Sequence, residues 1–312
     1  MNAGMAKRAH LVERALEAMG TSPLPSPAAL GSAPVVSVGT AGHRHVPEAA
    51  ERPAQAPPAA ALQRLPVIPM ARLQEAGLAF AVDAPGRSKL MEELAVVQHQ
   101  LLRGIEPALG EARAAPRHRL IMVTSARREE GKSFTSLNLA ASIASTASQP
   151  VLLIDVDGGA SSLSACLGVL TEPGLLGLAA DPDRPRETLL RPTAIERLSF
   201  LPHGRLLESA ARTPNPSALA AAIRSLAAAL PRHVLILDTP PALSTSDAQA
   251  LASIVGQVIM VVRAESTQRE EIEAALDLVE ACPVLQLLLN RTRLATNDSF
   301  GAHGEYGAAK HA

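Results

Sequence analysis

Residues 119–133 read RLIMVTSARREEGKS, and this stretch decides the fold. The apolar run 119–124 suits a buried strand, and the Ala- and Ser-rich segment 133–147 suits a helix packed closely on a sheet. Between them stands Gly131-Lys132-Ser133. A loop that leaves a strand and enters a helix through Gly-Lys-Ser is the setting of a P-loop, which holds nucleotide phosphates with backbone N–H groups and the lysine. The sequence therefore predicts a phosphate-binding loop.

The chemistry of such loops assigns roles to single residues. Lys132 is expected to neutralise the β- and γ-phosphates, and the Ser133 hydroxyl is expected to ligate Mg²⁺. The residues predicted to contact the nucleotide are Ala126, Arg127, Arg128, Glu129, Glu130, Gly131, Lys132, Ser133 and Phe134. The match to the usual pattern is incomplete, because Ala126 stands where a glycine normally opens the loop.

Two further apolar runs end in carboxylates. Residues 151–157 read VLLIDVD and end in Asp155 and Asp157, and residues 235–241 read LILDTPP around Asp238. The carboxyl ends of parallel strands meet at one edge of a sheet, so we expect these acids beside the phosphates, where they hold Mg²⁺ and its waters. The two-residue spacing predicts that both acids of the first run point to one side. A lone Asp at a strand end equally suits a turn, so the prediction rests on the three motifs together.

Apolar runs and helical patterns alternate from residue 119 onward. Strands are predicted at 119–124, 151–156, 198–201, 233–238, 257–263 and 284–289, and helices at 133–147, 217–230, 246–254 and 267–281. Strands that are apolar on both faces and separated by helices specify a parallel sheet covered on both sides. The predicted fold class is α/β, a P-loop NTPase with a mostly parallel sheet and helices on both faces.

Composition predicts four regions along the chain. Residues 1–20 carry a short amphipathic helix over 9–19, which suits packing on its own domain and docking on a partner equally well. Residues 21–70 are rich in Pro and Ala and are predicted to be a disordered linker. The nucleotide-binding domain is predicted over 71–294, and a flexible tail over 295–312.

The overall charge and the cysteines exclude other classes. With 29 basic and 30 acidic residues the net charge is −1, which argues against a nucleic-acid partner. No apolar run approaches the ~20 residues of a membrane span, and no signal peptide is evident, so a cytoplasmic location is expected. Cys166 and Cys282 are expected to be small buried residues rather than a disulfide or zinc site.

The order GKS, LLIDVD, LILDTPP resembles the Walker A, A′ and B series of bacterial tyrosine kinases, the autokinases of capsule and exopolysaccharide export. Within that family the chain is most similar to the tyrosine autokinase of exosortase-associated (PEP-CTERM) loci, with the likeness spanning 88–294. The segments that carry it are Leu11-Val12-Glu13-Arg14-Ala15-Leu16, Met91-Glu92-Glu93, Val123-Thr124-Ser125-Ala126, Leu201-Pro202-His203-Gly204, Cys282-Pro283 and Leu289-Asn290-Arg291-Thr292.

The resemblance implies transfer of the ATP γ-phosphate to tyrosine, with Mg²⁺ as cofactor. It implies that Lys132, Asp155 and Asp157 are catalytic, that Ser133, Asp155 and Asp238 hold the metal, and that Asn290 contacts the base. It also implies a membrane-embedded regulator of polysaccharide chain length as partner, which would bring the chain to the inner membrane. Tyr306 in the tail is the candidate phosphosite.

Several positions depart from that family. Its Pro-Gly-Glu-Gly-Lys is replaced by Arg128-Glu129-Glu130-Gly131-Lys132, and losing the Gly at 129 costs ~1–2 kcal/mol if the position needs a positive φ. The family has an Arg soon after the second A′ aspartate, whereas Asp157 is followed here by Gly158-Gly159-Ala160-Ser161. The family's oligomerisation helix has basic residues after its Glu pair, whereas this chain has Ala95 and Gln98. A single tail tyrosine replaces a cluster.

These departures leave three readings of the activity. The first is an active tyrosine autokinase, and the second is a nucleotide-binding regulator of the same pathway with degraded catalysis. The third is a switch ATPase of the cell-division and partition type, which carries a second Lys early in the loop where this chain has Arg127. The loss of the basic residues predicts weak self-association at most.

Overall fold

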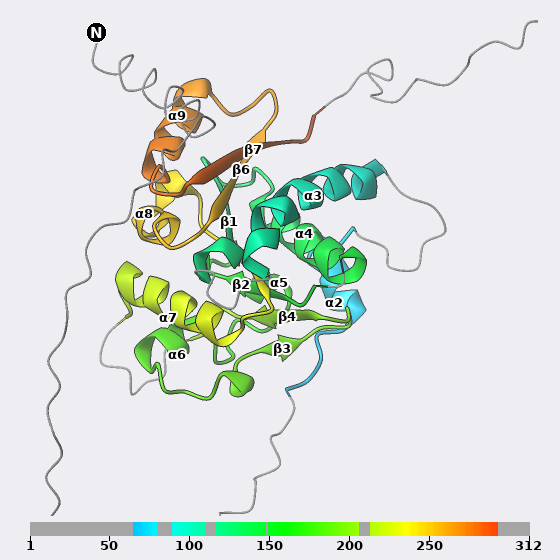
Figure 1. Cartoon of the computed structure of the whole chain (residues 1–312), viewed down its shortest axis with the longest axis vertical. Coiled ribbons are helices and arrows are strands. Elements are labelled where there is room, and N and C mark those ends of the chain that lie inside the picture. Colours follow the sequence, from blue (N-terminus) through cyan, green and yellow to red (C-terminus); the bar gives the residue numbers. More distant parts are fainter. Residues whose placement is uncertain (1–64, 80–88, 110–115, 148, 206–212, 293–312) are drawn as a thin grey trace, which may run out of the picture. The chain divides into compact units, whose positions relative to one another are not determined.

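The computed structural model describes residues 65–79, 89–109, 116–147, 149–205 and 213–292. All of them lie in the second of the two compact units of the chain, residues 61–312. Within this unit seven strands form one sheet with helices on both faces (Figure 1). The strands are β1 Leu120–Ser125, β2 Val151–Asp155, β3 Arg191–Pro192, β4 Leu198–Leu201, β5 Val234–Asp238, β6 Gln257–Arg263 and β7 Val284–Asn290.

Helices join and cover these strands. The α-helices are α2 Met70–Glu75, α3 Lys89–Leu109, α4 Lys132–Thr146, α5 Leu163–Cys166, α6 Leu175–Ala180, α7 Pro216–Ala229, α8 Asp247–Ala252 and α9 Arg269–Leu278. Short 3-10 helices lie at Pro116–Arg119, Arg186–Thr188 and Ala242–Ser244. The six predicted strands agree with the observed ones to within one residue at each end, and the four predicted helices to within three.

The strand order is β3-β4-β2-β5-β1-β6-β7, and every pairing is parallel except β3 with β4. Every residue of β1, β2 and β5 is buried, as expected for the centre of a parallel sheet covered on both faces. The predicted fold class is therefore confirmed.

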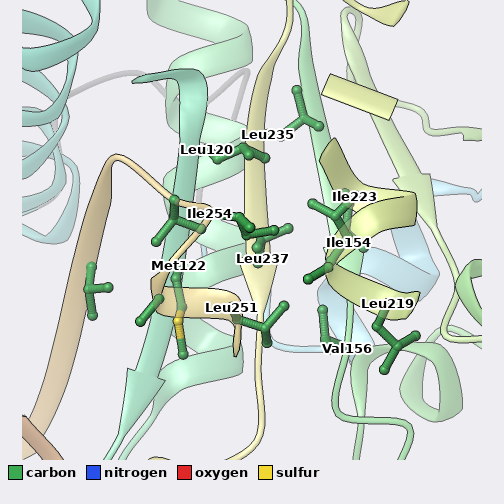
Figure 2. Packing of buried hydrophobic residues seen from close by; sticks show 14 of the residues in the cluster. Leu120, Met122, Ile154, Val156, Leu219, Ile223, Leu235, Leu237, Leu251 and Ile254 are labelled. Carbon is green, nitrogen blue, oxygen red and sulfur yellow. The ribbon is translucent and has the colours of Figure 1, made fainter. Parts of the chain in front are cut away.

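The core consists of one apolar layer on each face of the sheet. Leu120 and Met122 of β1 belong to the apolar layer on the side of α7 and α8, which also contains Ile223 and Leu251 (Figure 2). The alternate β1 residues belong to the layer under α2, α3 and α4. Helix α4 packs closely because it is rich in Ala and Ser, and every residue from Thr135 to Ala144 is buried.

The structure corrects the predicted end of the linker. Residues 65–70 are not a linker, because Ile68 is 2% exposed and forms a bridge with Thr193 beside β3. The Ile68 N–H donates to Pro192 O at 2.9 Å, and its carbonyl accepts from Ala194 N at 2.9 Å. Pro69 then caps α2, a position at which a missing N–H costs nothing. The buried Ile68 side chain and these two backbone hydrogen bonds hold the segment on the sheet edge.

A second correction concerns the cysteines, since Cys282 is buried but Cys166 is exposed at the end of α5. The predicted helix over 9–19, most of the linker, the tail and Tyr306 lie outside the described residues. Among the helices that the structure describes, none is both long and apolar enough to serve as a membrane span.

Candidate nucleotide-binding site

The sheet order brings the three sequence motifs to one edge. Strands β2, β5 and β1 are neighbours, and all three run in the same direction. Asp155 at the end of β2 lies opposite Asp238 at the end of β5. The loop that follows β1 starts beside them and leads into α4. Thr239 ties β5 to β1, because its N–H and hydroxyl both donate to Val123 O, at 3.1 and 3.0 Å.

The loop turns into α4 at Gly131, whose φ of 100° suits glycine. A Cβ at this position would overlap the side-chain amide of Asn290, so a second constraint also demands glycine. Helix α4 begins at the next residue, Lys132. The N–H groups of its first turn have no acceptors within the helix, and together with the helix dipole they favour an anion.

Two distant parts of the chain brace this loop. Glu130 is 2% exposed, and its carboxylate accepts the Arg127 N–H at 2.9 Å and the Thr267 hydroxyl. The Asn290 side-chain amide donates to Glu130 O at 2.9 Å. Arg127 forms an ion pair with Glu271 at 3.3 Å. In this structure Glu130 and Asn290 therefore hold the shape of the loop; their contact with a nucleotide stays a prediction.

Glu129 has a φ of 63°, in the left-handed region. Position 129, where the family that the sequence resembles has glycine, thus adopts a positive φ. The side chain of Glu129 is exposed and adds a carboxylate to a loop that is expected to bind phosphates. Both effects oppose the function of the loop, since one strains the backbone and the other repels an anion.

The A′ carboxylates differ in their contacts. Lys132, whose side chain is 12% exposed, forms an ion pair with Asp157 at 2.9 Å. Asp155 is buried and accepts three backbone N–H groups, from Asp157 at 3.0 Å, Gly158 at 3.5 Å and Ser164 at 2.7 Å. Strand β2 ends at Asp155 and the chain turns there, so the expected alternation of a strand does not extend to Asp157.

Asp238 is the least satisfied of the three acids. It is fully buried, and Ser136 donates to Oδ1 at 3.1 Å, but Oδ2 has no hydrogen-bond partner in the described part of the chain. Burial, reinforced by the negative charge of Asp155, raises the pKa of Asp238 to about 7, although Lys132 and the Ser133 and Ser136 hydroxyls oppose the shift. A buried oxygen of this kind calls for a proton or a cation.

The residues present fit Mg²⁺ bound together with a nucleotide. Mg²⁺ is usually held by one or two carboxylates and substrate phosphates rather than by a cage of protein ligands. Within the described residues no group of three or more His, Cys, Asp or Glu side chains could hold a metal on its own. Asp238 with its free oxygen and Ser133 at the start of α4 match the smaller set that a nucleotide would complete.

Two residues occupy places that sequence reasoning did not foresee. The imidazole of His203 lies over Gly158, where an added Cβ would overlap the ring, and its backbone N–H donates to Ser164 Oγ at 2.9 Å. In the sequence, only the segment Leu201-Pro202-His203-Gly204 pointed to a role for His203. Phe134 is partly exposed and lines a cavity with Leu94 of α3 and Leu288 of β7. Its predicted contact with the nucleotide stays a prediction.

The fold and the loop define a P-loop nucleotide-binding protein. The sequence is 31% identical over 198 residues to tyrosine-protein kinase CpsD of Streptococcus agalactiae. The matched segment covers 61% of this chain and 81% of CpsD. The chain belongs to the bacterial tyrosine-protein kinases. No family model matches the sequence.

Other relatives are larger. Tyrosine-protein kinase wzc of Salmonella typhi is 32% identical over 181 residues, which is 57% of this chain and 24% of that protein. Tyrosine-protein kinase ptk of Acinetobacter johnsonii is 31% identical over 188 residues, 59% of this chain and 24% of that protein. The match thus spans about a quarter of these two relatives.

Solved structures agree on the fold. The kinase domain of the Escherichia coli tyrosine kinase ETK superposes with a TM-score of 0.56 at 26% identity, covering 72% of this chain and 84% of that domain. The chimerical protein CapA2B2 superposes with a TM-score of 0.54 at 24% identity, covering 73% and 95%, a similarity that shows the fold alone.

Proposed function

We propose that this chain binds Mg-ATP at the loop 126–133 and transfers the γ-phosphate to tyrosine, as a regulator of exopolysaccharide biosynthesis. The observation that carries the proposal is the geometry around Lys132. It is the first residue of α4, is nearly buried, and faces Asp157, beside an unpaired carboxylate oxygen of Asp238. A lysine at a helix N-terminus beside carboxylates is the arrangement with which P-loop enzymes carry out phosphoryl transfer.

Each residue of the site has a separate proposed role. Lys132 exchanges Asp157 for phosphate oxygens when a nucleotide is bound, which leaves Asp157 available to accept the proton of a tyrosine hydroxyl. Asp155 fixes the turn that carries Asp157, through its bonds to the backbone. Asp238 and Ser133 would hold Mg²⁺. When bound, Mg²⁺ neutralises charge on the phosphate oxygens.

Substrate and partner are also proposals. Tyr306 is the proposed phosphosite, and a membrane-embedded regulator of polysaccharide chain length is the proposed partner, which would hold an otherwise cytoplasmic chain at the inner membrane. Both rest on resemblance to the family.

A second function has specific support. Glu129 in the left-handed region, and the lack of an arginine in the segment 158–161 after the A′ aspartates, favour a nucleotide-binding regulator with little catalysis.

Binding is tested by calorimetry with Mg-ATP and Mg-ADP. Lys132→Ala should lower the affinity by about 10- to 150-fold, because a hydrogen bond to a charged group contributes about 1.5–3 kcal/mol. Lys89→Ala is the matched control, since that lysine is 71% exposed on α3 and should leave affinity unchanged. Equal binding by wild type and Lys132→Ala would refute the proposed site.

Catalysis is tested separately, by mass spectrometry for phosphotyrosine after incubation with Mg-ATP. An active kinase should modify Tyr306, and Asp157→Asn should abolish the modification while nucleotide binding persists. Nucleotide binding with no phosphotyrosine in the wild type would favour the regulator instead.

A further inference from the structure

Strand β7 closes one end of the sheet and exposes leucines. Leu285, Leu287 and Leu289 are 40%, 61% and 61% exposed, and Val284 is 42% exposed. Of the eight large hydrophobic side chains that are exposed among the described residues, these are four. Exposed apolar surface is therefore concentrated on one strand, and such a concentration marks an interaction surface.

Leu285, Leu287 and Leu289, here called the leucine stripe, extend one apolar layer of the core to the edge of the sheet. In the β6–β7 register they lie opposite Val258, Met260 and Val262, which are all buried in the layer under α7 and α8. On this face of the sheet the helices therefore cover β6 but not β7, although the apolar side chains continue from β6 onto β7. Figure 1 shows β7 beside β6 at the margin of the sheet.

The backbone of β7 is also open on this side. Asn290 O accepts the N–H of Ala264, so the even-numbered residues of β7 direct their peptide groups toward β6. The peptide groups of the leucine stripe therefore point to the open edge. Edge strands of native proteins usually carry charges, prolines or bulges that prevent pairing, and β7, with the sequence VLQLLLN, carries neither a charge nor a proline.

We propose that β7 pairs with β7 of a second copy of this chain, antiparallel about a two-fold axis at Leu287. In that register Leu285 of each copy lies opposite Leu289 of the other, and Leu287 lies opposite itself. The two stripes then form one patch of six leucines across a continuous sheet. Such an interface is isologous, the form that most homodimers take.

The charges at the ends of β7 complement one another in this arrangement. Arg291 is exposed just after the carboxyl end of β7, and Glu280 is exposed just before its amino end; Arg263, at the end of β6, adds a positive charge beside Asn290. Antiparallel pairing brings the basic end of one copy beside the acidic residue of the other. No charged residue of β7 itself is opposed to a like charge, because the strand has none.

The C-terminal tail suits the stripe less well than a second copy does. Of the residues after 292, only Leu294, Phe300 and Tyr306 are large and apolar, whereas the stripe presents a leucine at every second position. One strand pairing buries less than the ~1,600 Å² of a standard interface. The dimer should therefore be weak and depend on concentration.

Sedimentation velocity of the full chain, from about 1 µM to about 1 mM, tests the proposal over the range of weak association. Wild type should shift from monomer to dimer. Leu287→Arg should stay monomeric, because position 287 lies on the two-fold axis and the two arginines would face and repel each other. Val67→Arg is the matched control: Val67 is 55% exposed beside β3, at the other end of the sheet, and this variant should dimerise like wild type. Circular dichroism verifies that each variant is folded, and Leu287→Gln replaces Leu287→Arg if the latter is not.

Mixing tests the register. An equimolar mixture of Leu287→Arg and Leu287→Glu should restore a dimer that neither variant forms alone, a result that mere loss of apolar surface cannot produce. A wild type that stays monomeric up to the highest concentration would overturn the proposal, as would dimers abolished by Val67→Arg but not by Leu287→Arg. A chain ending at Thr292 that dimerises while the full chain does not would assign the stripe to the tail instead.

Discussion

Replacing Glu129 by glycine should stabilise the chain and strengthen nucleotide binding at once. At a φ of 63° a non-glycine residue costs about 1–2 kcal/mol, and glycine loses about 0.5–1 kcal/mol more backbone entropy on folding. The net gain in the free energy of unfolding is therefore about 0–1.5 kcal/mol, measured by urea denaturation. Removing an exposed carboxylate from the phosphate loop should add up to about 1 kcal/mol of binding energy, or about fivefold in affinity for Mg-ATP.

Arg197→Gly separates the two effects. Arg197 is also exposed and has a φ of 65°, but it lies between β3 and β4, where its carbonyl accepts the N–H of Val151 at the start of β2, at the opposite edge of the sheet from the loop 126–133. Both variants should gain similar stability, and only Glu129→Gly should gain affinity. A Glu129→Gly variant that is less stable than wild type would refute the strain argument. Equal gains in affinity from both variants would refute the electrostatic one.

Two other sites allow similar tests. Gly158→Ala should lower the free energy of unfolding by about 2–5 kcal/mol, since φ is 59° and the new Cβ would overlap His203. Adding His203→Ala to the Gly158→Ala variant should restore about 1–3 kcal/mol of the free energy of unfolding. If no stability is restored, the steric explanation is wrong. For Asp238, whose pKa rises from 3.8 to about 7 on folding, the native state keeps a proton that the unfolded state loses. Stability without nucleotide should therefore fall by at most a few kcal/mol as pH rises from about 4 to about 7. Asp238→Asn should flatten this dependence in denaturation series at several pH values, and an unchanged slope would assign it to another group.

Much of the fold could be predicted because local patterns carried the information. The central strands are apolar on both faces, and the loop motif lies between a strand and a helix, so order and type followed from spacing. The short elements α5, α6 and β3 have four, six and two residues, too few to show a period. Residues 65–70 were misassigned because proline content outweighed the single buried Ile68.

The site was predictable in its motifs but not in its contacts. The chain order of Lys132, Asp155 and Asp238 indicated a shared sheet edge. The division of their roles depends on side-chain geometry, such as the backbone bonds of Asp155 and the free oxygen of Asp238. The braces of the loop join residues 137 and 160 positions apart, and no local pattern reports such pairs.

The longest of these braces has a consequence for protein synthesis. The loop leaves the ribosome early, but Asn290, which holds its Glu130 carbonyl, is made 160 residues later. Strand β1 must also wait for both of its neighbours, β5 and β6. Because domains fold as units while chains emerge at about 5–20 residues per second, the loop stays without its brace for roughly 8–30 seconds of translation. A chain interrupted before β7 therefore never completes its phosphate loop, so truncated products should be poor competitors for cellular ATP.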